Sequence, residues 1–175
     1  MNPIVEQAVI DCLAKTETGG HPGKVISLAE MKDLQSRLTN PLPAWYAELL
    51  MMYPLSSRYI NYPNQTPGDS HEDYDSMRLA RAIDIYNEME ECYPGLAIRD
   101  LGYTLFASDP TGSGDPYFIK TAEGDNPPVY KVYHDVSHIG TVVEKEGMNM
   151  IAVSLAEFFN NAAVDSYNNP LAGEE

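Results

Sequence analysis

The chain has 175 residues, 43% of them hydrophobic, and its 26 acidic and 11 basic residues give a formal net charge of −15. This length can bury the core of one domain and leaves little room for a second. Nucleic-acid binding requires clustered lysine and arginine, and because no such cluster occurs, the composition argues against a nucleic-acid partner.

Three helices are predicted in the first third of the chain. Apolar residues at one-face helical spacing predict a helix over residues 3–15. A capping box begins at Ser27, and the apolar stripe after it predicts a second helix that ends before Asn40. Pro43 suits the first turn of a third helix, and Pro54 ends that helix.

The next segment is polar. Residues 54–76 contain several prolines and an acidic run, which predicts a long loop with a short strand inside it at residues 58–62. A fourth helix is expected after this loop, because apolar residues from Leu79 to Tyr93 recur on one helical face. Pro94 ends that helix.

In the second half of the chain, short β-forming runs replace the helical spacing of apolar residues. Short runs rich in β-forming residues predict strands at 96–98, 104–108, 117–120, 129–134 and 139–143. A second capping box begins at Ser154 and opens the last helix. Helices, then consecutive strands, then a helix predict the α+β class, with an antiparallel multi-stranded sheet and helices packed on one side. We expect a single domain over residues 1–167 and a polar C-terminal tail over 168–175.

The stretch from Asp109 to Pro116 holds two glycines, two prolines and two aspartates between two apolar runs, which predicts a hairpin turn. It also invites a phosphate-loop or calcium-loop interpretation. A phosphate loop requires a lysine that is absent here and a helix where a strand is predicted. A calcium loop requires a glutamate at its twelfth position, where Lys120 stands.

Other chemical motifs are also missing. His134 and His138 have a four-residue spacing, but a strand end followed by a turn does not place them on one face. The chain has no G-x-S-x-G motif, and neither cysteine has basic neighbours that would activate it. We therefore predict no catalytic, cofactor or metal site. An enzyme or small-ligand binder would need a deep pocket lined by groups such as Asp109, Asp115 and His134.

Four segments resemble the SUKH superfamily, the Smi/Knr-like fold, and they occur in the order found in that family. They are a Leu-Pro helix at residues 42–50, a strand and Gly/Asp turn at 105–118, a strand with a polar turn at 128–135, and a closing Ser-x-x-Glu-Phe helix at 153–159. Together they span roughly residues 25–165.

The resemblance implies a non-enzymatic binding domain. Many bacterial members resemble immunity proteins of polymorphic or contact-dependent toxin systems, and other members are regulatory scaffolds. A charge of −15 suits capture of a toxin with a basic surface, such as a nuclease. We expect a cytoplasmic immunity protein, since no signal-peptide pattern and no membrane segment occur. The alternative is a regulatory or scaffold domain without a toxin partner.

The acidic loop is the predicted partner-binding surface. Carboxylates would face a basic partner, and two tyrosines would act as aromatic anchors. The residues are Asp69, Glu72, Asp73, Asp75, Tyr62 and Tyr74. A solvated acidic loop without a partner is the alternative interpretation.

Overall fold

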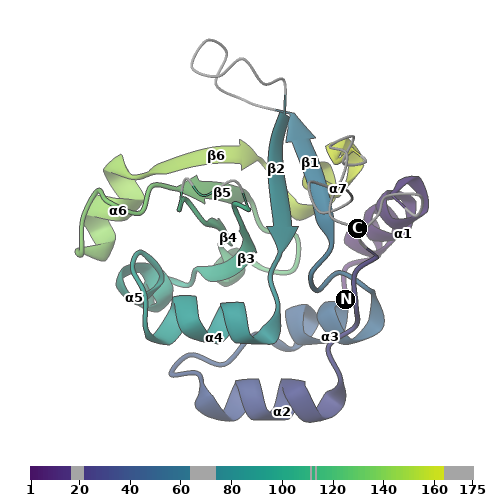
Figure 1. The fold of residues 1–175 in the computed structure, drawn as a ribbon, viewed down its shortest axis with the longest axis horizontal. Coiled ribbons are helices and arrows are strands. Elements are labelled where there is room, and N and C mark those ends of the chain that lie inside the picture. Colours follow the sequence, from purple (N-terminus) through teal and green to yellow (C-terminus); the bar gives the residue numbers. More distant parts are fainter. Residues whose placement is uncertain (17–21, 64–73, 111, 113, 164–175) are drawn as a thin grey trace, which may run out of the picture.

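The structure, a computed structural model, describes residues 1–16, 22–63, 74–110, 112 and 114–163. Six strands form one antiparallel sheet in which each strand lies beside its neighbours in the chain (Figure 1). The strands are β1 (Tyr59–Pro63), β2 (Tyr74–Leu79), β3 (Thr104–Ser108), β4 (Tyr117–Ile119), β5 (Val129–Val132) and β6 (Met148–Ala152).

Seven α-helices accompany the sheet within the described residues. They are α1 (Pro3–Lys15), α2 (Leu28–Arg37), α3 (Ala44–Met52), α4 (Ala82–Glu90), α5 (Gly95–Ile98), α6 (Gly140–Glu146) and α7 (Leu155–Asn161). Two short 3-10 helices, η1 (Arg99–Leu101) and η2 (Thr121–Glu123), lie in the connections. The predicted α+β class, with one antiparallel sheet in a single domain, is confirmed.

Local signals placed several helices correctly. Residues 3–15 form α1 as predicted, and Ser27 caps α2 through a complete capping box. Pro43 is the N-cap of α3 rather than its first residue. The Ser154 hydroxyl accepts a hydrogen bond from the Glu157 backbone N–H at 3.1 Å and begins α7.

Five assignments were wrong, one of them the omission of β6, for which no strand was predicted. Leu79 ends β2, so α4 begins three residues later than the apolar face suggested, and β2 itself was missed. Residues 96–98 lie in α5 and residues 139–143 mostly in α6, although both runs favour strands by composition. Gly140 approaches α5 so closely that a Cβ there would lie 2.1 Å from the Ala97 carbonyl oxygen. This tertiary contact outweighs the preference of the β-branched residues.

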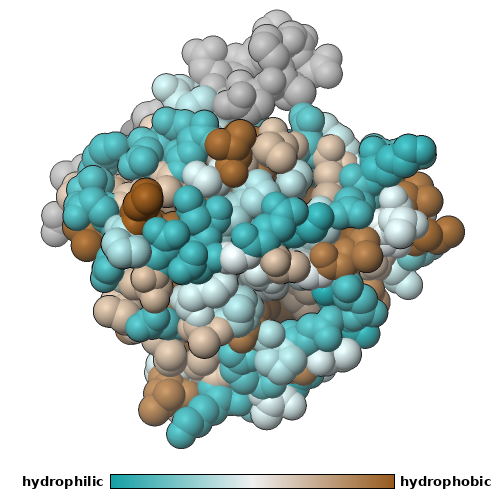
Figure 2. Space-filling model, turned by 180° about the vertical axis from the view of Figure 1, so that it is seen from behind, coloured by the Kyte–Doolittle hydropathy of each residue, from teal (hydrophilic) through white to brown (hydrophobic). Residues whose placement is uncertain are grey.

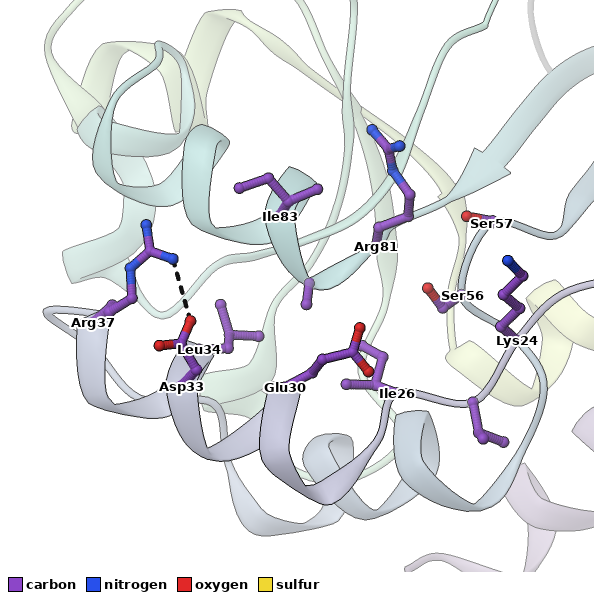
Figure 3. A pocket seen from close by; sticks show the side chains of 12 residues that line it. Lys24, Ile26, Glu30, Asp33, Leu34, Arg37, Ser56, Ser57, Arg81 and Ile83 are labelled. Carbon is purple, nitrogen blue, oxygen red and sulfur yellow. Dashed lines mark hydrogen bonds and ion pairs between the residues drawn. The ribbon is translucent and has the colours of Figure 1, made fainter.

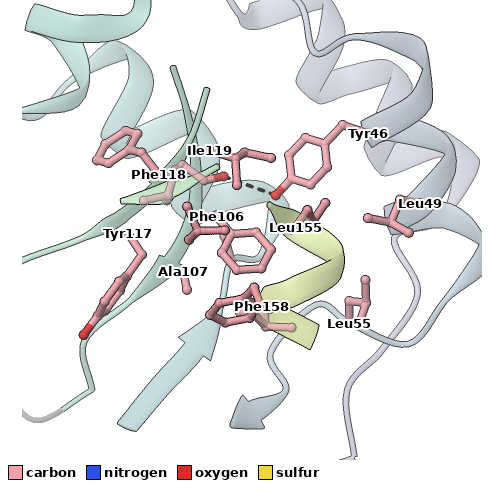
Figure 4. Close-up of a cluster of buried hydrophobic side chains, with 14 of the residues drawn as sticks. Tyr46, Leu49, Leu55, Phe106, Ala107, Tyr117, Phe118, Ile119, Leu155 and Phe158 are labelled. Carbon is pink, nitrogen blue, oxygen red and sulfur yellow. Dashed lines mark hydrogen bonds between the residues drawn. The ribbon is translucent and has the colours of Figure 1, made fainter. Parts of the chain in front are cut away.

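The hydrophobic core centres on α7 and the middle of the sheet (Figure 4). Phe158 has no exposed surface, and its ring packs edge-on against Phe106 of β3 with centroids 4.9 Å apart. The Tyr46 hydroxyl of α3 donates a hydrogen bond to the Leu105 carbonyl oxygen at 3.2 Å. Phe118 and Ile119, which point to opposite faces of β4, are both fully buried, so both faces of this strand are covered.

Candidate functional site

The Asp109–Pro116 segment joins β3 to β4, which pair antiparallel, so the predicted hairpin connection is confirmed. Thr111 and Ser113 lie outside the described residues. Gly112 and Gly114 have φ angles of 93° and 81°, a region that glycine adopts without a Cβ penalty. The two glycines therefore serve the turn geometry, and the two aspartates flank it.

Three carboxylates, one from β2 and two from the turn, gather near Tyr117 at the start of β4. Burial, and then the negative charges of Asp75, Asp109 and Asp115, raise the pKa of Tyr117 above its usual range. The Tyr117 hydroxyl points away from the centre of the buried cluster (Figure 4). Lys131 is the cation next to this group, with its Nζ 3.7 Å from Asp75 Oδ1.

His134, just after β5, closes one side of the turn. Asp115 Oδ1 lies 2.8 Å from His134 Nδ1 and also accepts a hydrogen bond from the His134 backbone N–H at 3.2 Å. The hydrogen bond to Asp115 raises the pKa of His134. Asp115 therefore favours the protonated form of His134.

A small cavity of about 210 Å³ lies at the same turn, on the side of α4. Its charged lining residues are Arg78, Asp84, Glu88 and Asp109. Burial raises the pKa of Glu88, although its carboxylate accepts a hydrogen bond from the Gly95 backbone N–H at 3.0 Å. Asp84 is shared between Arg81 at 2.6 Å and Arg78 at 3.5 Å, so its charge is already compensated. Of the three residues named as markers of an enzyme pocket, only Asp109 lines this cavity.

We call these residues together the acidic turn surface. Its carboxylates are Asp75, Asp84, Glu88, Asp109 and Asp115, and its cationic side chains are Arg78, Arg81 and Lys131, with His134 at the margin. The carboxylates outnumber the permanent cations, and they come from β2, α4 and both sides of one turn. The arrangement is therefore a group of side chains with an excess of carboxylates.

A larger groove of about 450 Å³ lies between α2 and the start of α4 (Figure 3). Ile26, Leu34 and Ile83 contribute apolar side chains to it, while charged groups of both signs stand along its walls. Those charges are largely used within the chain. Arg37 pairs with Asp33 at 3.2 Å and stacks on a tyrosine, and Arg81 pairs with Asp84. Most of the charged groups that line the groove therefore already have partners within the chain.

The structure places the predicted binding residues in different environments. Asp75 lies in the acidic turn surface, and Tyr74, 45% exposed, lies one residue before it at the start of β2. Tyr62 is wrong as a surface anchor, because it is 1% exposed and stacks on Phe158. The predicted residues Asp69, Glu72 and Asp73 lie outside the described residues.

The sequence did not predict that Lys131 and the α4 carboxylates, Asp84 and Glu88, belong to the acidic turn surface. Lys131 reaches Asp75 only because β5, β4, β3 and β2 follow one another across the sheet. No local motif marks such a contact. Asp109 and Asp115 were marked as turn residues and as groups that an enzyme pocket would use, but not as members of a charged surface.

Two further classes of site have no support in the described part of the chain. No three His, Cys, Asp or Glu side chains there are arranged to hold a metal ion. Within the same residues, no helix has the length and apolar character to cross a membrane.

Comparison with known proteins does not assign the chain to a family. No protein-family model matches the chain, and no curated protein matches it either. The similarity to the SUKH superfamily therefore remains a hypothesis carried by four sequence segments.

Proposed function

We propose that this chain is a non-enzymatic immunity protein of the SUKH type, which captures and neutralises a cognate bacterial toxin with a basic surface, such as a nuclease. The observation that carries the proposal is the acidic turn surface, where a carboxylate of β2 and two carboxylates of the Asp109–Pro116 turn meet beside Tyr117. The proposal places the protein in the cytoplasm of the cell that makes the toxin. There it would bind the toxin before the toxin acts on the producing cell.

The charge of the chain supports this function through association kinetics. With a formal charge of −15, the protein attracts a basic partner at long range. At short range, the acidic turn surface would meet lysine and arginine side chains of the toxin, and complementary charge would fix its orientation. For a nuclease toxin these are the residues that hold substrate phosphates, so binding would also block the substrate.

A stable complex with a toxin would need a contact area larger than the turn itself offers. A stable protein–protein interface buries about 1,600 Å² in total, roughly 800 Å² on each partner. Tyr74 extends the acidic turn surface along β2, and its exposed ring is the type of side chain that dominates interface energetics. On the face shown in Figure 2, apolar residues are scattered among hydrophilic ones.

Two of the segments that carry the SUKH resemblance pack against β3, the strand that leads into this turn. The Leu-Pro helix is α3, and its Tyr46 hydroxyl bonds to the β3 backbone at Leu105. The closing Ser-x-x-Glu-Phe helix is α7, which packs Phe158 against β3 at Phe106. Both helices thus stabilise the strand that leads into the Asp109–Pro116 turn.

The test is co-expression with the toxin domain encoded beside the gene for this chain. We expect the chain to restore growth of cells that express the toxin, and to co-purify with a catalytically inactive toxin variant. A chain that neither restores growth nor co-purifies would rule the immunity function out. A gene with no toxin-like neighbour would instead favour the regulatory scaffold.

A further inference from the structure

One wall of the groove between α2 and α4 is built by two chain segments that pair outside the sheet. The Lys24 N–H donates to the Ser56 carbonyl oxygen at 2.7 Å, and the Ser56 N–H donates to the Lys24 carbonyl oxygen at 3.0 Å. Residues directly opposite each other in an antiparallel pair have their side chains on the same side, with Cβ atoms about 4.5–5.5 Å apart. The side chains of Lys24 and Ser56 therefore lie next to each other, and both line the groove (Figure 3).

The Ser56 hydroxyl is a buried polar group that the chain itself does not satisfy. Ser56 is 7% exposed, and its hydroxyl makes no hydrogen bond within the described residues, although its backbone makes two. Leaving a buried hydroxyl without a hydrogen bond costs free energy, so this group requires a partner from the groove. Figure 3 shows the Ser56 side chain turned into the groove, where a bound ligand would reach it.

Ser57 lines the same wall in a backbone conformation that serine rarely adopts. Its φ is 66°, and in the described part of the chain it is the only residue other than glycine with a positive φ. Its N–H donates to the Leu79 carbonyl oxygen at 3.0 Å, whereas its hydroxyl has no partner among the described residues. Residues held in this conformation occur preferentially at functional sites. Two adjacent hydroxyls are thus available to the groove.

The charge of the groove is opposite to that of the whole chain, which carries −15. Its described lining residues include three basic and two acidic side chains, which are Lys24, Arg37, Arg81, Glu30 and Asp33. Hydrogen bonds from Ser27, and more weakly the charge of Lys24, lower the pKa of Glu30. Arg37 and Arg81 form ion pairs, whereas Lys24 forms none within the described residues. Because charges farther away than about 8 Å are screened at physiological ionic strength, these local groups favour an anion.

We propose that this groove binds a small monocarboxylic acid with an apolar body. The carboxylate accepts hydrogen bonds from Lys24 Nζ and from the hydroxyls of Ser56 and Ser57. The apolar body lies along Ile26 and Ile83, which line the groove beside this wall. Ile83 is 46% exposed, so a ligand that covers it removes apolar surface from water.

The number of available donors and the size of the groove define the ligand class. One unpaired ammonium and two neutral hydroxyls match a single negative charge. A phosphate monoester carries about −1.5 to −2 at pH 7, so part of its charge would lack a partner. The volume of about 450 Å³ lies within the range of about 300–1,000 Å³ that is typical of small-molecule sites.

Titration of the full chain with octanoate, followed by proton–nitrogen correlation NMR, tests the site. We expect the amide signals of residues 24–26 and 56–57 to shift, with half-saturation below about 1 mM. Two related probes separate the parts of the ligand. Octylamine has a similar apolar chain with the opposite charge, and acetate has the carboxylate without an apolar body. Each should bind at least about tenfold more weakly than octanoate.

Variants of the wall test which groups hold the carboxylate. Lys24→Gln should weaken octanoate binding about tenfold or more, because it removes the unpaired charge. Lys32→Gln is the matched control, since it makes the same charge change at an exposed position of α2 that does not line the groove, and it should leave binding unchanged. Ser56→Ala should weaken binding about fivefold without lowering the stability of the unliganded chain, because no internal hydrogen bond is lost.

The proposal would be overturned if octanoate caused no shift at these residues up to about 10 mM. Equal binding of octanoate and octylamine would overturn it too, as would equal binding of octanoate and acetate or equal affinity of the Lys24→Gln and Lys32→Gln variants. A Ser56→Ala variant that loses stability would show that the hydroxyl serves the fold rather than a ligand. These measurements need no toxin, so their outcome is independent of the proposed immunity function.

Discussion

Phe158 of α7 stacks on Tyr62 of β1 with ring centroids 4.8 Å apart and an interplanar angle of 6°. Both side chains are buried, and the same phenylalanine ring also meets Phe106 of β3 edge-on. One side chain therefore joins a short helix to two separate strands. This contact also explains why Tyr62 belongs to the core rather than to a binding surface.

Phe158→Ala should destabilise the protein by about 3–5 kcal/mol, because the substitution leaves a cavity between α7 and the two strands. Chemical denaturation followed by circular dichroism measures the loss. Val153→Ala is the control: Val153 is 69% exposed and adjoins the same helix, and its truncation should change stability by less than about 0.5 kcal/mol. Equal losses in the two variants would contradict the packing described for Phe158.

The N-terminus of α7 is fixed by side chains. Ser154 Oγ accepts a hydrogen bond from the Glu157 N–H, and Asn126 Oδ1 accepts one from the Ala156 N–H at 2.9 Å. Ser154→Ala should therefore lower the free energy of unfolding by about 1 kcal/mol, while Ser154→Asp should restore most of it. Urea titration of both variants measures this. A Ser154→Asp variant as unstable as the alanine variant would show that the serine acts through something other than capping.

Local signals predicted elements whose ends are set by nearby residues. Ser27 and Ser154 each begin a helix, because a hydroxyl caps backbone N–H groups only three residues away. The strand predicted at residues 139–143 was wrong, because the close contact of Gly140 with Ala97 depends on the packing of α6 on α5, which no local signal encodes. The position of Tyr62 two residues after Ile60 was the available signal, because this spacing puts both side chains on one face of β1, and both are buried.

The candidate site was predictable only in part. The Asp109–Pro116 turn follows from its composition, and Asp75 was marked by its acidic surroundings. Their proximity depends on the register that pairs Arg78 of β2 with Ser108 of β3, a contact across 30 residues. No local pattern specifies that register, because loops of different length can join the same two strands.

The contact between His134 and Asp115 predicts a pH-dependent contribution to stability. The pKa of His134 is raised in the folded state, so the contact stabilises the fold below the unfolded value of about 6.5 and is lost as pH rises through the folded value. Asp115→Asn should return the pKa of His134 toward about 6.5, measured by NMR titration. The stability difference between the variant and the native chain should be larger at about pH 5.5 than at about pH 8.5.

Asp135→Asn is the control for that titration. Its charge makes a smaller contribution to the raised pKa of His134 than the hydrogen bond with Asp115 does, so the pKa should fall less. If both variants lowered the pKa of His134 equally, the negative charge of its surroundings, rather than the hydrogen bond with Asp115, would be the cause of the raised pKa.

Toxin capture through the acidic turn surface predicts a local effect on the association rate. Asp75→Asn with Asp109→Asn removes two carboxylates near Tyr117 and should slow association with the toxin about tenfold at low salt. Glu91→Gln with Glu146→Gln makes the same change in net charge at two exposed positions and should slow it much less. Stopped-flow fluorescence at about 50 and 500 mM salt measures both pairs, and the difference should shrink at high salt because screening shortens the range of the field. Equal slowing of the two pairs would mean that net charge alone steers the toxin, and the binding surface would then have to be sought elsewhere on the chain.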